Sequence, residues 1–416
     1  MATKDTTTEK KFTRYQGLVI VLLALTQFTV VLDFMVMSPL GDMLMKSMSL
    51  TTSQFGFAVS GYAFSAGISG LLTAGFADRF DRKKLLLFFY IGFIAGTLFC
   101  GLATTYLMLI AARIITGLFG GVIGSISLAI MADLFPLQQR GRAMGFIQMG
   151  FGASQVLGIP IGLYIANHWG WQSPFLMIGG LATIIWLIVM LKLHPVTGHL
   201  EMKTEKTAIT HLWHTLKQHH YRIGFLSTAL LSLGGFMMMP WGSAFAVNNL
   251  HVSYAQLPVL FMVGGIVSLI IMPLVGKLSD KIDKAKIFTA AAIWMMVVVV
   301  IYTNLAPVYF GIVILMNILM MIGIMSRMVP AMALVSALPK MQDRGAFMSI
   351  NSSLQQIAGG VAAGVGGLIV VQQTKTSPLL HYNTLGYVIV IIIIINIIMI
   401  YRVSKLIKTQ KHTEKL

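Results

Sequence analysis

The chain has 416 residues, of which 56% are hydrophobic and only 10% are charged, and its formal net charge is +17. Soluble globular proteins carry about 25% charged residues, so this composition excludes an ordinary soluble protein and places most of the chain in a lipid bilayer. The Lys and Arg residues fall mainly in the N-terminus, in alternate loops and in the C-terminus. That distribution orients a membrane protein and requires no nucleic acid as a partner.

The N-terminal stretch 1–16 is polar and has no cleavable signal pattern, so it is expected to remain as a cytoplasmic tail. Apolar segments follow that are long enough to cross the hydrocarbon core, and each must be helical because lipid cannot pair with backbone groups. Twelve such spans are predicted: 17–40, 55–77, 85–103, 106–133, 143–166, 173–192, 223–247, 257–276, 287–304, 308–337, 346–371 and 383–404. An even number places both termini on one side, and the basic loops predict that this side is the cytoplasmic face of the cell (inner) membrane.

Ionisable residues are rare inside these spans. Asp33 is the single acid well inside one, and Arg113 and Arg327 are the two bases. Such residues are costly in a membrane and are candidates for function. Asp33 and Arg113 each lie about seven residues from the periplasmic end of their segments, a depth of roughly 10 Å, so they are able to pair. We expect Asp33 to share a water-accessible central chamber with Arg113 and to exchange protons there; a static ion pair that orients two helices is the alternative.

The second half of the chain repeats the first. The stretch GFADRFDRKK at 75–84 matches GKLSDKIDKAK at 276–286, and each lies between two long apolar segments. The repeat predicts two six-helix halves with a binding site at the seam between them and a rocking motion of one half against the other. Five units are expected: a tail at 1–16, a first bundle at 17–192, a linker at 193–222, a second bundle at 223–404 and a tail at 405–416.

The acids of these charged loops do not contribute to topology, which depends on Lys and Arg. Asp78 and Arg82 lie at the predicted cytoplasmic mouth, and Asp280 lies in the repeated loop. A carboxylate there is able to meet helix amides and nearby arginines, so the pattern predicts a latch that forms in one conformation. Orientation by positive charge alone is the other interpretation.

The linker 193–222 is rich in histidine, and His211 and His214 are spaced to share a helical face. A metal site is one interpretation, although no cysteine or carboxylate cluster accompanies it. An amphipathic helix on an anionic membrane surface explains the same residues.

Four local patterns resemble those of the major facilitator superfamily. GFADRFDRKK resembles its loop motif G-x-x-x-D-R-x-G-R-[KR], and Arg113-Ile-Ile-Thr116-Gly117 resembles R-x-x-Q-G. Gly158-Ile-Pro160-Ile-Gly162 resembles the glycine-proline motif of the antiporter branch, and Asp33 followed by Pro39 resembles a pattern of drug/proton antiporters. The resemblance implies an all-α membrane protein with twelve transmembrane helices in two pseudo-symmetric bundles.

The same resemblance implies that Asp133 joins the charge relay of the cytoplasmic gate. It also implies a central cavity lined by the first, fourth, seventh and tenth helices, with their neighbours beside them. The resemblance therefore favours Gln27, Gln155, Asn317 and Gln355 as lining residues, and hydrogen bonding between helices is the alternative for each. Trp241, near a run of methionines, and the intramembrane Arg327 complete the candidate substrate-binding residues. Arg327 is expected to bind an anionic group of the substrate, to reach the first half, or to bond carbonyls freed near Pro330.

These features predict a secondary active transporter that works by alternating access. The leading interpretation is proton-coupled efflux of small amphipathic, drug- or sugar-like compounds, and the alternative is uptake of a small anionic metabolite. The chain shows no phosphate-binding loop and no nucleophile beside a base, so neither an enzyme nor an ATP-driven pump is expected. We expect no cofactor and no metal, and a monomer whose partners are its substrate, protons and lipid.

Overall fold

The computed structural model describes residues 12–73, 77–201, 208–340 and 343–413. Helices account for most of this part of the chain. Those of the first half are α1 Arg14–Val36, α2 Gly41–Met48, α3 Thr52–Thr73, α4 Arg82–Gly101, α5 Tyr106–Leu134, α6 Leu137–Ala153, α7 Ile159–Trp169 and α8 Ser173–Lys192. Those that follow are α9 Ala208–Lys217, α10 His219–Phe236, α11 Gly242–Asn248, α12 Leu257–Lys281, α13 Lys284–Thr303, α14 Phe310–Ser336, α15 Arg344–Ile369 and α16 Tyr382–Thr413.

Within the described residues, eleven helical segments are long and apolar enough to cross a membrane. α15 has a suitable length of 26 residues but contains several polar side chains, among them Asn351, Gln355 and Gln356. It packs between α3 and α10. Together these segments account for the predicted spans of a multi-pass membrane protein, and they confirm the predicted all-α fold.

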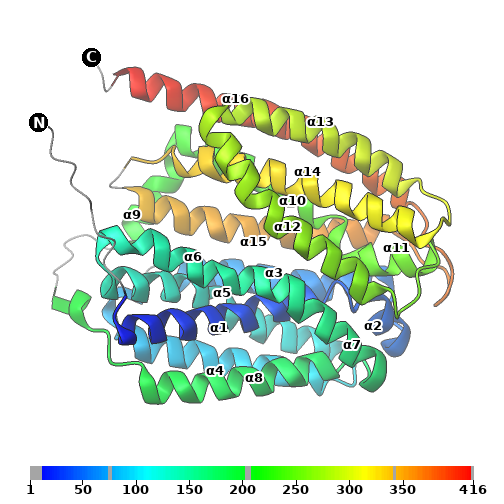
Figure 1. Ribbon diagram of the computed structural model, residues 1–416, viewed down its shortest axis with the longest axis horizontal. Helices are drawn as coiled ribbons and strands as arrows, with labels where there is room; N and C mark the ends of the chain where they lie inside the picture. Colours follow the sequence, from blue (N-terminus) through cyan, green and yellow to red (C-terminus); the bar gives the residue numbers. More distant parts are fainter. Residues whose placement is uncertain (1–11, 74–76, 202–207, 341–342, 414–416) are drawn as a thin grey trace, which may run out of the picture.

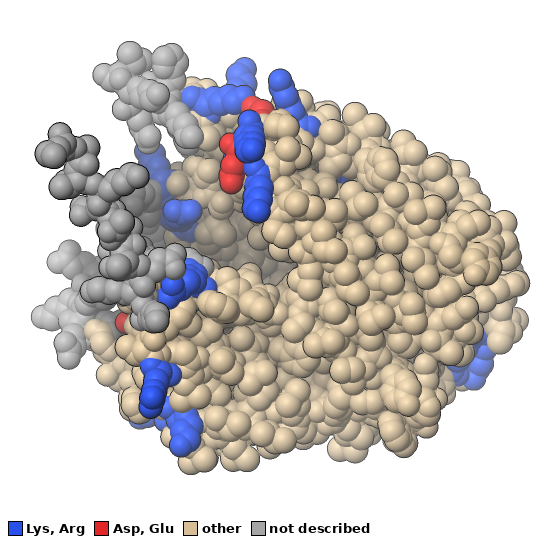
Figure 2. Space-filling model, in the orientation of Figure 1, with Lys and Arg blue, Asp and Glu red and all other residues tan. Residues whose placement is uncertain are grey.

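The helices form two bundles that lie one above the other in Figure 1, with α1 to α8 in the first and α10 to α16 in the second. They meet along α3 and α15, and where α12 packs against α7 and the π-helical turn Ser154–Gly158. The start of α1 and the end of α16 lie at the same end of the molecule. We call this the basic end, because Lys and Arg gather there in Figure 2, and the surface is hollowed between the bundles at this end.

Prolines divide two of the predicted spans. α1 ends at Val36 rather than continuing to residue 40, and the predicted span 223–247 is broken into α10, the 3-10 turn Met239–Trp241 and α11. Pro39 and Pro240 lie in these breaks, where a missing N–H and the proline ring end regular helix. Both breaks lie at the end opposite the basic end, which we call the closed end.

The repeated charged loops have the same local structure in both halves. Asp81 caps the N-terminus of α4 and accepts from the backbone N–H of Lys83 at 2.9 Å, and Asp283 caps α13 and accepts from that of Ala285 at 2.9 Å. Both caps have φ of −54° and ψ of 123°. An aspartate at an N-cap pairs an otherwise unbonded N–H, so the repeat preserves a helix start.

Candidate transport site

The ion pair between Asp33 and Arg113 joins α1 to α5 inside the first bundle. An Arg113 Nη1 hydrogen donates to Asp33 Oδ2 at 2.9 Å, and the hydroxyl of Thr97 on α4 donates to Asp33 Oδ1 at 3.1 Å. Both side chains of the pair are 0% exposed. Three helices therefore meet at one buried carboxylate.

The sequence predicted that this pair lies in a water-accessible central chamber, but both side chains are buried inside the first bundle. In this conformation Asp33 and Arg113 are enclosed by the first bundle, because Tyr62 of α3 covers the guanidinium with its ring centroid 4.5 Å from Arg113 Cζ. Tyr62 also packs against Phe34, with ring centroids 5.2 Å apart. One aromatic ring thus separates the ion pair from Phe34, and Phe34 lines the pocket between the bundles.

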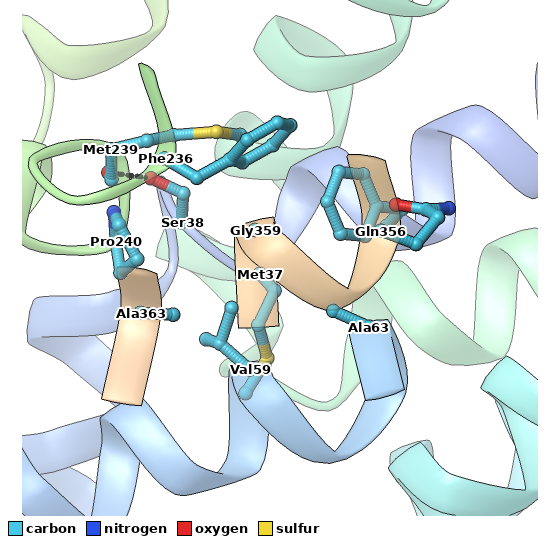
Figure 3. Close-up of a pocket in the computed structure, with 11 residues that line it drawn as sticks. Met37, Ser38, Val59, Ala63, Phe236, Met239, Pro240, Gln356, Gly359 and Ala363 are labelled. Carbon is cyan, nitrogen blue, oxygen red and sulfur yellow. Dashed lines mark hydrogen bonds between the residues drawn. The ribbon is translucent and has the colours of Figure 1, made fainter. Parts of the chain in front are cut away.

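That pocket lies at the seam of the two bundles, and it is on the side of the closed end because Ser38, Met239 and Pro240 of its lining belong to the helix breaks. Figure 3 shows the side chains that line it. Four helical segments supply its wall: the end of α1, α3, the broken region after α10, and α15. The lining residues are Phe34, Met37, Ser38, Val59, Ala63, Phe236, Met239, Pro240, Gln356, Gly359 and Ala363. Ser38 and Gln356 are the polar members, and the Ser38 hydroxyl donates to the carbonyl of Met239 across the seam. The wall is otherwise apolar, and the methionines give it side chains that adapt to varied ligands.

The predicted substrate residues are not among those that line this pocket. Gln355 precedes the lining residue Gln356 on α15, and Trp241 is fully buried against Phe55 at the closed end. A substrate-binding role for Gln355 stays a prediction. Sequence spacing locates a helix at the seam, whereas the rotation of that helix depends on its packing against α3.

Three more of the candidates contact neighbouring helices within their own half. Gln155 Nε2 lies 3.7 Å from Met35 Sδ, and the Gln27 side-chain oxygen lies beside Gly124 of α5. Asn317 packs against Gly264 of α12, and its buried Oδ1 has no hydrogen-bond partner among the described residues.

Arg327 lies in the interior of the second bundle and is 3% exposed. Its Nη2 approaches Gly234 of α10, and its Cζ is 5.8 Å from the ring centroid of Phe288 on α13. Within the described part of the chain its Nε and Nη2 have no hydrogen-bond partner. A buried guanidinium of this kind has donors available for an anion or for water.

Among the described residues, the contact given between predicted gate residues lies within the first bundle. Arg82 Nε lies 3.4 Å from Asp133 Oδ2, a contact between α4 and α5 within the first half. Asp280 is exposed at the end of α12, and the side chain of Asp78 lies outside the described residues. Asp133 was placed in the relay from the family resemblance, and it does meet Arg82.

The histidine-rich segment includes a short helix, α9, that packs against α15 and α10 at the basic end. The side chain of His211 lies outside the described residues, and His214 is exposed. In the portion of the chain that is described, no group of three or more His, Cys, Asp or Glu residues is arranged to hold a metal ion.

Comparison with known proteins agrees with this architecture. A family model described as Major Facilitator Superfamily matches residues 23–363 and, in a second alignment, residues 224–415. An uncharacterized MFS-type transporter of Bacillus subtilis is 24% identical over 375 residues, which cover 90% of this chain and 94% of that protein. A probable sugar efflux transporter of Helicobacter pylori is 28% identical over 163 residues, 39% of this chain and 41% of that protein.

Solved structures share the fold at low identity. A bacterial homologue of the human lysosomal transporter Spinster, in an inward-facing and unoccupied conformation, superposes with a TM-score of 0.78 at 15% identity, covering 96% of this chain and 99% of that one. A D-xylose-proton symporter gives 0.75 at 19% identity, covering 94% and 97%. Two helical bundles, a pocket at their seam and a family match that extends through both halves agree: the chain is a membrane transporter and belongs to the Major Facilitator Superfamily.

Proposed function

We propose that this transporter exports small amphipathic compounds across the cell (inner) membrane, in exchange for protons, with its basic end and both termini in the cytoplasm. In this orientation the hollow in Figure 2 opens to the cytoplasm, so the conformation described above is inward-open. The excess of Lys and Arg at that end supports the orientation. The apolar pocket with two polar side chains suits an amphipathic ligand.

The observation that supports proton coupling is the series of side-chain contacts that links the pocket to the buried carboxylate of Asp33. Phe34 lines the pocket, Tyr62 packs on Phe34 and on Arg113, and Arg113 binds Asp33. A ligand that displaces Phe34 therefore acts on the ring that covers the ion pair. A proton on Asp33 weakens its bond to Arg113, so ligand and proton bias the same contacts between α1, α3 and α5.

The transport cycle follows from this arrangement. In the inward-open conformation Asp33 is ionised and paired, and the pocket takes up substrate from the cytoplasm. Opening of the closed end hydrates the region beside Phe34 and admits a proton to Asp33, while substrate leaves outward. Return to the inward-open conformation releases the proton, because the buried Arg113 again favours the carboxylate.

The gate residues fit this cycle as a proposal. In the outward-open conformation the basic end closes, and Asp78, Arg82, Asp133 and Asp280 then form the contacts of the gate between the bundles. The pair between Arg82 and Asp133 keeps the arginine beside the mouth in the meantime.

Transport into everted membrane vesicles tests the function. We expect a fluorescent amphipathic dye to accumulate when the vesicle interior is acidic and to stop accumulating when an ionophore dissipates the pH gradient. The Asp33→Asn variant is expected to lose the gradient-driven accumulation while still exchanging dye for dye, because the pocket remains intact. Gradient-driven accumulation by Asp33→Asn at an unchanged pH dependence would exclude this coupling role.

Arg327 favours a second candidate, the movement of a compound with an anionic group. Its Nε and Nη2 donors are buried without partners among the described residues, and no acid lies beside them. An uptake symporter for such a compound would accumulate it in right-side-out vesicles with an acidic exterior, which is the opposite direction to the leading proposal.

The names of two similar proteins support separate parts of the leading proposal. The Helicobacter protein is named as a probable sugar efflux transporter, and one structural neighbour is a D-xylose-proton symporter. The first name supports export, and the second supports coupling to protons.

A further inference from the structure

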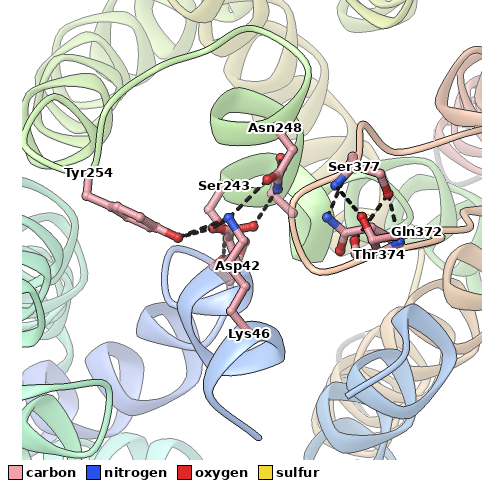
Figure 4. Close-up of polar contacts among 10 residues, drawn as sticks. Asp42, Lys46, Ser243, Asn248, Tyr254, Gln372, Thr374 and Ser377 are labelled. Atoms are coloured by element: carbon pink, nitrogen blue, oxygen red, sulfur yellow. Dashed lines mark hydrogen bonds and ion pairs between the residues drawn. The ribbon is translucent and has the colours of Figure 1, made fainter. Parts of the chain in front are cut away.

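The closed end contains a second buried carboxylate, that of Asp42 on α2, and Figure 4 shows the polar contacts around it. Asp42 is 1% exposed. It belongs to the first half, but two of its partners come from the second. The Nδ2 of Asn248 on α11 donates to its Oδ1, and the hydroxyl of Tyr254, on the loop before α12, donates to its Oδ2.

The backbone beside Asp42 is joined to the second half as well. Its own N–H donates to Ser243 Oγ at 3.4 Å, and Ser243 Oγ donates to the carbonyl of Ser38 at 2.8 Å. Lys46, one turn further along α2, lies 2.8 Å from Asp42 Oδ2 and also donates to Asn248 Oδ1 at 3.0 Å. One carboxylate thus holds α2, α11 and the loop before α12 together.

The basic end offers a contrast. The ion pair described there between α4 and α5, Arg82 with Asp133, remains within one half. At the closed end the charged side chain binds across the seam, so its contacts must break before the two bundles separate there.

We propose that Asp42 is a further coupling residue of transport: an acid that holds the closed end shut when ionised and permits outward opening when it binds a proton. The proposal goes beyond the role assigned to Asp33, since it concerns another half-channel and another set of partners. It does not depend on the identity of the substrate.

The chemistry follows from the acceptors. Asp42 Oδ2 accepts hydrogen bonds from both Lys46 and Tyr254. A proton bound to that oxygen competes with these two donors and removes the negative charge that pairs with Lys46. The outcome is loss of an ion pair and of at least one hydrogen bond across the seam. No bond other than O–H forms or breaks.

The groups that face Asp42 fix the sign of the pH dependence. Lys46 is the cation beside it, and Lys375, on the segment before α16, donates to the carbonyl of Lys46 at 3.0 Å. Burial, and then the hydrogen bond with Asp42, raise the pKa of Tyr254 above its ordinary value, so the phenol stays a donor at neutral pH. His251 is exposed on the same loop. A proton that reaches this carboxylate from the outer side therefore acts against the contacts with Lys46 and Tyr254 and favours opening of this end.

A cysteine reporter in the pocket tests the proposal. Cys100 is buried and is the single cysteine of the chain, so the reporter is Val59→Cys in a Cys100→Ser background. A membrane-impermeant maleimide is applied to the outer face of intact cells. We expect slow labelling of the reporter chain, and about tenfold faster labelling when Asp42→Asn is added, which corresponds to a shift of one decade in the opening equilibrium.

The pH response separates a proton-binding role from a purely structural one. Lowering the outside pH stepwise is expected to speed labelling of the reporter chain and to leave Asp42→Asn unaffected, after correction for thiolate formation with free cysteine. Asn304→Ala is the matched control, since Asn304 bonds Val300 and Tyr387 within the second half on the same side of the membrane. Its labelling should equal that of the reporter chain.

Two outcomes overturn the proposal. One is slow outer labelling of an Asp42→Asn protein whose thermal unfolding midpoint in detergent equals that of the reporter chain, which means that the carboxylate does not hold this end. Faster labelling of Asp42→Asn that still rises on acidification places the proton elsewhere. Either result leaves the Asp33 experiment unaffected, because that assay measures accumulation.

Discussion

Arg113 and Arg327 are both buried arginines in the interior of a helical bundle, but within the described ranges of the chain only the first has an acid beside it. Arg113 binds Asp33 at 2.9 Å under the ring of Tyr62, whereas Arg327 packs near Phe288 and Gly234. The two halves thus share a fold and differ in electrostatics. A guanidinium with a carboxylate forms a site where one proton changes the charge, and a guanidinium without one remains a cation in every step of a cycle.

In the proposed cycle the two halves have separate tasks: the first half exchanges the proton, and the second half has spare donors for a ligand or water. This contrast is testable through protein stability, from the largest expected effect to the smallest.

Arg113→Met is expected to destabilise the protein by about 3–5 kcal/mol, because it leaves the buried Asp33 carboxylate without its cation. The midpoint of thermal unfolding in detergent measures the loss. Combining it with Asp33→Asn should recover much of the stability, since the unpaired charge is then gone. A single variant as stable as the unmodified chain would show that Asp33 is already neutral there.

Gly234→Asp adds an acid to the second half and makes it similar to the first. A Cβ at Gly234 would lie 3.8 Å from Arg327 Nη2 and 3.6 Å from Ile392, so the side chain fits. We expect a favourable coupling of about 1–3 kcal/mol with Arg327 in a double-mutant cycle with Arg327→Met. Gly234→Asn is the uncharged control, and equal coupling for Asn and Asp would contradict an ionic interaction.

Thr97→Val keeps the shape of the side chain and removes the hydroxyl that donates to Asp33 Oδ1 at 3.1 Å. The expected loss of stability is about 1–2 kcal/mol, the usual effect of removing a hydrogen bond to a buried charged group. A shift in the pH dependence of dye accumulation should accompany it, because the ionised form of Asp33 loses a donor and protonates at higher pH. Thr183→Val, whose hydroxyl bonds the carbonyl of Gly179 on its own helix, serves as the control.

Arg327→Met is expected to change the unfolding free energy by less than about 1 kcal/mol, and toward greater stability, because it leaves no acid unpaired and fills the same space with apolar atoms. Dye export should be retained, while transport of any anionic compound should fall. Loss of stability comparable to that of Arg113→Met would indicate that an anion or buried water already binds this arginine.

Much of the architecture follows from local patterns. Long apolar segments predicted the helices, and the two charged loops predicted the repeat, which the matching caps at Asp81 and Asp283 now explain. Depth along the first and fourth spans predicted that Asp33 and Arg113 are able to meet, because rise per residue is nearly constant in a helix. The domain bounds and the roles of the site residues stay predictions.

What sequence spacing missed depends on helix breaks and helix rotation. Asp42 was overlooked because the first span was expected to run to residue 40, which leaves the next residues in a loop, whereas the break near Pro39 starts a new helix that faces α11. Gln356 rather than Gln355 lines the pocket because the close packing of α15 on α3 sets its rotation.

By itself the sequence determined what must cross the lipid, which end carries the basic loops, and that two ionisable groups lie at one depth in the first half, since these depend on hydropathy, charge and a fixed rise per residue. Only the tertiary structure decided which groups touch: that Tyr62 covers the ion pair, that Arg327 has no acid beside it, and that Asp42 binds across the seam. Contacts between helices depend on rotation and close packing, and no period along a single helix specifies them.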